Sequence, residues 1–407
     1  MDARGVRFAG LSAAVAAAVV LAACSSSPAA TPSNNASGAT SPASVPSVSA
    51  TSFTSDFSVM SQLKGLASQG KGKIGVLLPE TTTSARYASF DAPYLTRALQ
   101  QAGLTPDQYT ITNAQGSDAT EKTQAEAAMT QGATVLIMDP IDSGVGAAIE
   151  SEAQSRGVKV IDYDRLTLGG TRDYYVSFDN VQVGKLIGQG FVDCAQAWNV
   201  TTPNVLVMRG APTDNNATLF AQGYDGVLKQ YFDAGQYVKV GEPAGTWDPP
   251  TAQTTFQQQY TAHKNINAVV TPNDDNANAI ISYLKTLNIK ADTFPTTGQD
   301  ATLTGLQNVL SGYQCGTVYK PIYLEAQAAV VLALYLRAGQ TPPSGLANGQ
   351  TADSTANTQV PSVLLTPVWV TTANMASTVV KDEFVKASDL CSGSFASACQ
   401  QAGLSAS

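Results

Sequence analysis

Polar side chains follow most of the short apolar runs in this chain, where they could bind a ligand together. The runs are Ile74–Leu78, Val135–Met138, Val158–Ile161, Val205–Met208, Ala268–Val270 and Thr317–Tyr319, with a weaker one at Thr293–Thr297. The polar residues that follow them include Ser84, Arg86, Asp164, Arg165, Asp214, Asn216, Asn273, Asp300 and Lys320. Ligands of open α/β sheets bind beyond the carboxyl ends of the strands. We therefore expect these residues to meet in one site.

The chemistry of this set favours a neutral polyol as ligand. Its charged members are three cations and three carboxylates: Arg86, Arg165, Lys320, Asp164, Asp214 and Asp300. Each hydroxyl of a polyol can donate to a carboxylate and accept from a cation or an amide. An anionic ligand would instead require an excess of positive charge. Tyr87 and Trp247 could supply flat faces for the apolar side of a sugar ring.

A purely structural explanation competes at several of these positions. Asp, Asn and Ser after a strand are ordinary N-caps of the next helix, so Asp214 and Asn273 could serve only the backbone. Capping does not account for Arg86, Arg165 or Lys320, because cations are mildly unfavourable near a helix N-terminus. Each of these three needs a carboxylate or a ligand as partner.

The composition excludes several functional classes. The 407 residues carry 23 Lys and Arg, 31 Asp and Glu, and one His, with a formal charge of −8. A nucleic-acid partner is disfavoured because phosphate contacts need clustered basic residues. One His and five Cys without metal-ligand spacing predict neither a metal site nor a cofactor.

The N-terminus predicts export. Arg4 and Arg7 precede the apolar run Phe8–Val20, which ends in Leu21-Ala-Ala-Cys24. This order is typical of a signal peptide over residues 1–23, and its end resembles a bacterial lipobox that would lipidate Cys24. The alternative is an Ala-rich secretory signal with an incidental Cys. Residues 24–72, rich in Ser, Pro and Ala at their start, are expected to form a lipid-anchored tether, with a short helix over residues 53–72 before the core.

Four cysteines remain in the exported chain, which suggests disulfides. Cys391 and Cys399 are eight residues apart and could close a small loop, leaving Cys194 to pair with Cys315. Free buried thiols are the alternative.

The apolar runs alternate with Ala-, Gln- and Leu-rich stretches of helical character. Continuous apolar runs are typical of strands buried on both faces, and strand–helix alternation indicates parallel sheets covered by helices. The body is too long for one such sheet, so the sequence predicts an α/β protein with two lobes.

Several segments resemble the xylose-binding protein family, type I periplasmic sugar-binding components of ABC transporters. These segments are Asp162–Arg165, Tyr175–Gly184, Gly210–Phe220, Gly298–Asp300 and Thr317–Pro321. The resemblance implies a type I periplasmic-binding-protein fold, in which a three-strand hinge joins two Rossmann-like lobes. By analogy, residues 73–178 plus 322–356 form the N-terminal lobe, 179–321 plus 357–384 the C-terminal lobe, and 385–407 a Cys-containing tail.

The resemblance also implies a ligand set and a function. The family's sugar-binding positions correspond to Arg86, Tyr87, Asp164, Arg165, Asp214, Asn216, Trp247, Asn273, Asp300 and Lys320. Tyr87 replaces a Trp, and the loop 79–85 is one residue longer than the family pattern, which leaves the sugar open. The implied protein is a monomeric substrate-binding lipoprotein on the outer face of the cell membrane, touching the membrane only through its anchor. It would deliver a monosaccharide, xylose or a related aldose, to an ABC-transporter permease.

Three alternatives remain. One is a glycoside-processing enzyme that uses the cleft carboxylates; we expect no catalysis, because carboxylates beside Arg or Lys stay ionised whereas a general acid needs a raised pKa. Another is a binding protein for a different polyol or a small oligosaccharide. The third, a sugar-responsive DNA-binding regulator, would require a helix-turn-helix and a basic N-terminus.

Overall fold

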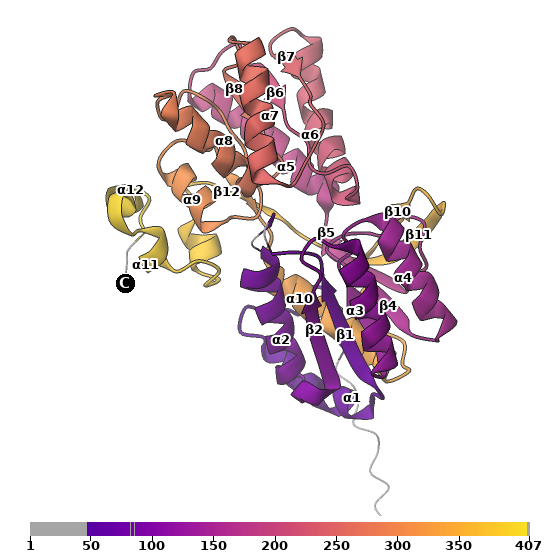
Figure 1. Cartoon of the computed structure of the whole chain (residues 1–407). Helices are drawn as coiled ribbons and strands as arrows, with labels where there is room; N and C mark the ends of the chain where they lie inside the picture. The colour runs from indigo at the N-terminus through magenta and orange to yellow at the C-terminus, as the bar shows by residue number, and fades with distance from the viewer. Residues whose placement is uncertain (1–46, 82, 85, 405–407) are drawn as a thin grey trace, which may run out of the picture. The chain divides into compact units, whose positions relative to one another are not determined.

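A computed structural model describes residues 47–404 of the chain, apart from residues 82 and 85 (Figure 1). The predicted signal peptide, the predicted lipidation site Cys24 and most of the predicted tether lie outside the described residues. The described residues form an α/β structure with a seven-stranded, a three-stranded and a two-stranded sheet, and most neighbouring strands are parallel, as the alternation of strands and helices predicted.

The first lobe is built on a seven-stranded sheet. Its strands lie in the order β10 (Gly349–Asp353), β11 (Thr358–Leu365), β5 (Tyr174–Phe178), β4 (Lys159–Tyr163), β3 (Ala133–Met138), β1 (Lys73–Leu78) and β2 (Tyr109–Asn113). All neighbouring strands are parallel except the antiparallel pair β10–β11. The carboxyl ends of six strands therefore meet at one edge of the sheet.

Helices cover both faces of this sheet. They are α1 (Lys64–Gln69), α2 (Ala92–Gln101), α3 (Asp118–Thr130), α4 (Ser143–Ser155) and α10 (Ile322–Arg337). Val135 and Ile137 of β3 belong to the core cluster that contains α10, while Leu136 and Met138 pack with α3 and α4. Successive side chains of a strand point to opposite faces, which explains why this run is apolar throughout.

The segment before β1 is part of the first lobe. Residues Ser58–Leu63 form a 3-10 helix, η1, that leads into α1. Phe57, Met60 and Leu63 are fully buried, and Arg97 of α2 lies 4.3 Å above the Phe57 ring. The prediction that the tether extends to residue 72 is therefore wrong at its C-terminal end, because these apolar side chains cover the outside of α2 and α10.

The second lobe has a smaller and more interrupted sheet. Its strands are β7 (Val238–Gly241), β6 (Asn204–Val207) and β8 (Ala268–Val270) in one piece, and β9 (Thr317–Tyr319) with β12 (Val368–Val370) in another. Two isolated parallel bridges, Val269 with Thr296 and Gln299 with Val318, continue the pairing between the pieces. The surrounding helices are α5 (Asn180–Ala197), α6 (Asn215–Asp233), α7 (Pro249–Ala262), α8 (Asp274–Thr286) and α9 (Leu303–Leu310).

Helices α5 and α6 pack backbone to backbone. A Cβ atom placed on Gly184 would lie 2.0 Å from the carbonyl oxygen of Phe220, and one placed on Gly223 would lie 2.3 Å from that of Val181. Only glycine permits this approach. The pair thereby fixes the position of the start of α6, which carries two of the predicted site residues.

Three connections join the lobes: β5 to α5, β9 to α10, and β11 to β12. The last of these lies at residues 366–367. The predicted boundary at residue 357 is wrong, because β11 pairs with β5 and completes the first sheet.

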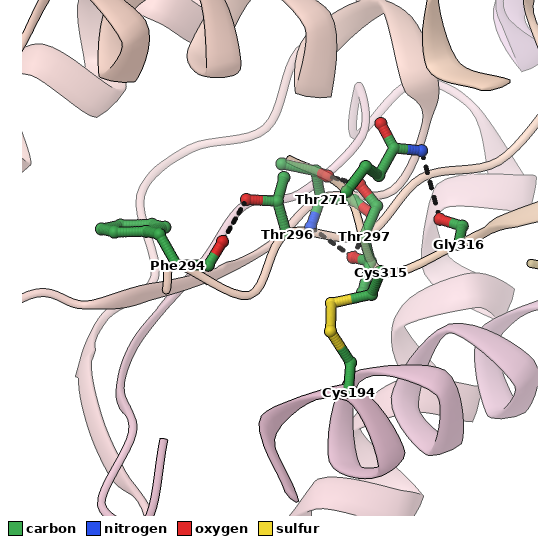
Figure 2. The surroundings of a disulfide bond; sticks show 8 residues. Cys194, Thr271, Phe294, Thr296, Thr297, Cys315 and Gly316 are labelled. Carbon is green, nitrogen blue, oxygen red and sulfur yellow. Dashed lines mark hydrogen bonds between the residues drawn. A yellow bond between two sulfur atoms is a disulfide. The ribbon is translucent and has the colours of Figure 1, made fainter. Parts of the chain in front are cut away.

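Both predicted cysteine pairs are joined. Cys194 of α5 bonds Cys315, which precedes β9, with a Cα–Cα distance of 5.5 Å (Figure 2). Cys391 and Cys399, 5.7 Å apart, link α11 (Ala387–Leu390) to α12 (Ala396–Gln401). The tail packs on α9 of the second lobe, since Leu390, Cys391 and Cys399 share a core cluster with Leu306 and Val309.

Candidate functional site

One pocket brings together all ten residues predicted to bind the ligand. Its lining consists of Ser84, Arg86, Tyr87, Asp164, Arg165, Asp214, Asn216, Phe220, Trp247, Asn273, Gln299, Asp300 and Lys320. The space between these atoms is about 340 Å³, part of it open to solvent. The lining comes from both lobes and from the crossing that carries Lys320.

Asp164 stands at the centre of the first-lobe wall, directly after β4. Its backbone has a φ of 58°, a left-handed conformation that is uncommon outside glycine. Its carbonyl oxygen accepts hydrogen bonds from Tyr175 Oη (2.8 Å), Ser177 Oγ (2.8 Å) and Asn216 Nδ2 (2.9 Å). The donor from Asn216 comes from the second lobe, so the conformation of Asp164 depends on both lobes.

The Asp164 carboxylate is surrounded by donors. Arg86 Nη1 lies 2.8 Å and Lys320 Nζ 3.6 Å from Oδ1, and Tyr87 Oη donates to Oδ2 over 3.0 Å. Burial opposes the charge, but the cations Arg86, Lys320 and Arg165 outweigh it and lower the pKa of Asp164. For this residue the expectation of an ionised carboxylate holds.

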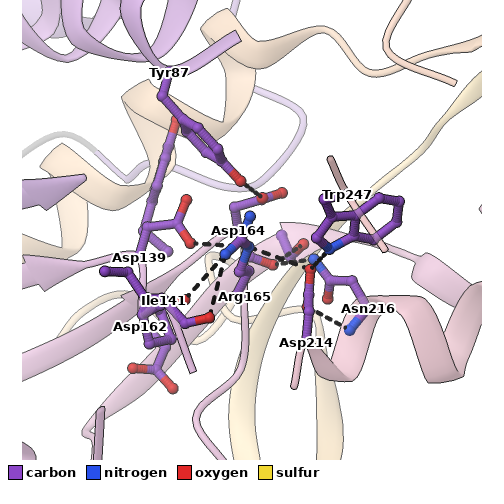
Figure 3. Close-up of polar contacts among 12 residues, drawn as sticks. Tyr87, Asp139, Ile141, Asp162, Asp164, Arg165, Asp214, Asn216 and Trp247 are labelled. Carbon is purple, nitrogen blue, oxygen red and sulfur yellow. Dashed lines mark hydrogen bonds and ion pairs between the residues drawn. The ribbon is translucent and has the colours of Figure 1, made fainter. Parts of the chain in front are cut away.

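Asp214 and Asn216 form the facing wall at the start of α6 (Figure 3). Asp214 caps the helix by accepting from Asn216 N (2.8 Å), and its other oxygen accepts from Trp247 Nε1 (3.0 Å). Arg165 Nε lies 3.2 Å from the same oxygen. Asn273 likewise caps α8 through Asn276 N while it lines the pocket. Asp214 and Asn273 therefore each do both things that the sequence allowed: they cap a helix and they line the pocket.

The pKa of Asp214 is shifted in the opposite direction to that of Asp164. Burial raises it, and the favourable charge of Arg165 does not fully compensate. The surroundings of Asp214 therefore favour its charged form less than those of Asp164 do.

Asp300 and Lys320 complete the pocket beside the crossing from β9 to α10. Lys320 Nζ lies 3.4 Å from Asp300 Oδ1, and Asp300 has a φ of 96°. Strained backbone of this kind persists only when surrounding contacts enforce it. The hydrogen bond from Asp300 N to Val318 O (2.9 Å) supplies such a contact.

Sequence reasoning missed two lining residues, Phe220 and Gln299. Phe220 follows Asn216 by four residues on α6, a spacing that places both on one helix face, and Lys320 Nζ lies 5.9 Å from its ring. Gln299 directly precedes Asp300 and is 3% exposed. Both fall within the segments that carried the family resemblance.

Three further carboxylates lie behind the pocket, and these alter the predicted charge balance. Asp91, Asp139 and Glu325 are each completely buried. Asp139 directly follows β3 and lies 3.7 Å from Arg165 Nε. Burial raises the pKa of Asp139 and of Glu325 well above the usual value.

The described residues contain neither a cluster suited to a metal ion nor a helix suited to span a membrane. No group of three or more His, Cys, Asp or Glu among them is arranged to hold a metal ion. Within residues 47–404, no helix has the length and apolarity needed to cross a bilayer.

Comparison with known proteins gives a consistent result. Residues 74–341 match the family model described as periplasmic binding protein domain. The D-xylose-binding periplasmic protein of Escherichia coli K12 is 38% identical over 285 residues, covering 69% of this chain and 82% of that protein. The multiple sugar-binding periplasmic receptor ChvE of Rhizobium radiobacter is 34% identical over 338 residues, covering 79% and 92%.

A solved structure agrees with these sequences. A carbohydrate transporter solute-binding protein from Chloroflexus aurantiacus, in complex with D-glucose, is 30% identical and superimposes with a TM-score of 0.69. The match covers 78% of this chain and 97% of that one.

Proposed function

The chain belongs to the periplasmic binding protein family, and on this premise we propose that it captures a neutral monosaccharide for an ABC transporter. Xylose or a related aldose is the ligand that we infer. The observation that carries the proposal is the pocket itself, where three cations, three carboxylates and three aromatic side chains from both lobes line one small space. Alternating donors and acceptors suit hydroxyl groups, and aromatic faces suit the C–H side of a sugar ring.

Binding would couple to the position of the lobes. Donors and acceptors come from both sides of the pocket, so a sugar can complete all of its hydrogen bonds only when the lobes approach. The ligand therefore favours a closed arrangement by differential binding.

Titration calorimetry against a panel of monosaccharides tests this function. D-xylose, D-glucose, D-galactose, L-arabinose and D-ribose are the first members, with a disaccharide to test longer ligands. We expect one or more aldoses to bind with a Kd in the micromolar range or tighter. Absence of binding to every neutral sugar would exclude the proposal.

We further propose that the protein is an exported, monomeric lipoprotein, anchored through Cys24 to the outer face of the cell membrane. The order of charge, apolar run, small residues and Cys at the N-terminus supports the anchor. Metabolic labelling with a palmitate analogue tests it: wild-type protein should be labelled and Cys24→Ala should not. Co-purification with a permease in mild detergent tests the transporter partner.

We propose that the site binds its sugar without catalysis. The raised pKa of Asp214 is the one feature that would suit a general acid, so the enzymatic alternative has a direct test. Incubation with aryl glycosides should release no phenol. Release that disappears in Asp214→Asn would establish a glycosidase instead.

A further inference from the structure

The guanidinium of Arg86 is held by three carboxylates at once. Its Nε donates to Asp91 Oδ2 (3.0 Å), and Nη2 donates to Asp91 Oδ1 (2.7 Å) and to Glu325 Oε2 (2.9 Å). Nη1 donates to Asp164 Oδ1 (2.8 Å). A guanidinium has five N–H groups. Among the described residues four are thus engaged, which leaves one N–H of Nη1 for a ligand.

Two of these carboxylates do not line the pocket. Asp91 ends the π-helix η2 (Tyr87–Asp91), Glu325 lies in the first turn of α10, and both are completely buried. Tyr163 Oη also donates to Asp91 Oδ1 over 2.6 Å. Neither carboxylate can touch a bound sugar except through Arg86.

Burial of the Glu325 carboxyl group costs free energy, and the group makes few contacts that offset this cost. Its only side-chain hydrogen bond within the described part of the chain is the one from Arg86, and its Oε1 has no partner there. The desolvation cost of a buried carboxyl group with half of its hydrogen-bonding capacity unused offsets much of what its ion pair with Arg86 contributes to stability. Stability alone therefore does not explain a glutamate at this position.

We propose that Glu325, together with Asp91, is a positioning residue for sugar binding: the two carboxylates fix Arg86 so that a single N–H of Nη1 faces the ligand. This inference rests on the proposed function. Asp91 sets the plane of the guanidinium by binding Nε and Nη2 together. Glu325 takes the second hydrogen of Nη2 and holds the side chain against the start of α10. Because α10 directly follows the crossing that carries Lys320, Glu325 also links Arg86 to an element that begins at the connection between the lobes.

Three variants of the full chain test the proposal: Glu325→Leu, Glu325→Gln, and the control Glu150→Leu. Glu150 of α4 is equally buried and also lies beside an arginine, with Oε2 3.4 Å from Arg172 Nε, but it does not line the pocket. D-xylose and D-glucose are titrated into each variant by calorimetry, and thermal denaturation is recorded in parallel.

Glu325→Leu should raise the Kd for the bound sugar about tenfold or more, because the Arg86 guanidinium, a charged hydrogen-bond donor, would no longer be held in one orientation. Its Tm should fall, because Nη2 of Arg86 loses an acceptor, but the variant should still fold, because Asp91 and Asp164 continue to pair the guanidinium. Glu325→Gln keeps an acceptor for Nη2, so its Kd should remain within about threefold of the wild type. Glu150→Leu should also lower the Tm, because Thr171 N and Arg172 lose an acceptor, but it should leave the Kd unchanged.

A ligand-free measurement separates this inference from the proposed function. The Nε–H signal of Arg86 in nitrogen-15 NMR spectra should exchange with solvent faster in Glu325→Leu than in the wild type and in Glu325→Gln. If the wild type binds no sugar, the proposed function fails and this signal alone decides the positioning role. An unchanged Kd together with an unchanged Arg86 signal in Glu325→Leu would overturn the proposal, and so would a variant that unfolds.

Discussion

Single residues of the pocket hold the backbone in place and offer groups to a ligand at the same time. Asp214 caps α6 with one oxygen and binds Trp247 and Arg165 with the other. The position of a polar residue after an apolar run did not by itself decide whether it lines the pocket: Asp214 follows one run and lines it, whereas Asp139 follows another and lies behind it. The buried carboxylates behind the lining were not predictable in this way, because which side chains lie in the second layer depends on packing between distant elements.

Trp247 offers a test of one such dual role. Trp247→Phe keeps an aromatic face but removes the N–H that Asp214 accepts over 3.0 Å. Since Asp214 is buried, this lost hydrogen bond should raise the Kd for the sugar by roughly 3- to 10-fold. Calorimetry measures the change. Trp198→Phe serves as control because Trp198 lies outside the pocket, and equal Kd values for both variants would contradict the role.

Glu121 predicts a pH-dependent stability. It is fully buried on α3 and accepts from Ile141 N over 3.2 Å, and burial raises its pKa from 4.5 to about 8. The folded state then holds a proton that the unfolded state releases above pH 4.5. The stabilisation that the protonated Glu121 gives to the folded state is complete below pH 4.5 and is lost as the pH rises through about 8.

Glu121→Gln removes this titration and retains the acceptor for Ile141. The free energy of unfolding of the variant, relative to that of the wild type, should be ~4 kcal/mol higher at pH 8.5 than at pH 4.5. This follows from the raised pKa of Glu121 at 1.36 kcal/mol per pKa unit. Urea denaturation at the two pH values measures the difference. Parallel pH profiles of the two proteins would show that Glu121 ionises normally in the folded state.

At the scale of elements, the interior strands β1, β3, β4 and β6 were predictable from apolar runs, whereas the interior strands β5 and β11 and the edge strands β2, β7 and β10 were not. β3 and β4 appear as apolar runs because helices cover both of their faces. β2, β7 and β10 lie at sheet edges and contain many half-buried or exposed residues. A strand with one neighbour and partial cover has no need of a continuous apolar run, so the sequence carries a weak signal for it.

The contact between α5 and α6 gives a prediction at this scale. Gly223→Ala should force the two backbones apart and lower the free energy of unfolding by about 1–3 kcal/mol or more, since the added Cβ would meet a carbonyl oxygen. Gly226→Ala on the same helix is the matched control, because no atom lies within 4 Å of its Cβ position. That control should gain roughly 0.5–1 kcal/mol from helix propensity. Thermal denaturation compares them; a harmless Gly223→Ala would refute the close packing.

At the scale of the whole molecule, the two disulfides should differ in their contribution to stability. The bond Cys194–Cys315 spans 121 residues, and Cys391–Cys399 spans 8. Restriction of the unfolded chain predicts a loss of about 5 kcal/mol when the first pair is replaced by serine and about 2.5 kcal/mol for the second. Denaturant titration of both double variants tests this. Equal losses would indicate that native contacts, rather than loop length, determine the stabilisation.

Two lobes were predictable from the length of the body, but their boundaries could be predicted only through the family resemblance. Apolar runs show that strands exist, but they do not say which sheet each strand joins. The third crossing was therefore placed near residue 357, although β11 continues to pair in the first sheet up to Leu365. The tail and the segment before β1 lie outside the resemblance, and their packing onto α9 and α10 depends on contacts between residues far apart in the chain.

The three crossings also determine the order in which the molecule can be completed as it is made. The first sheet receives its last two strands, β10 and β11, only at residues 349–365, and α10 reaches its face only at residues 322–337. The disulfide of the second lobe closes at Cys315, before either of these events. A chain synthesised from its N-terminus therefore cannot finish the lobe that it begins first until the other lobe is almost entirely made. Until then, the uncovered faces of β1, β3 and β4 are surfaces that could aggregate, so the order of synthesis leaves the first lobe incomplete for longer than the second.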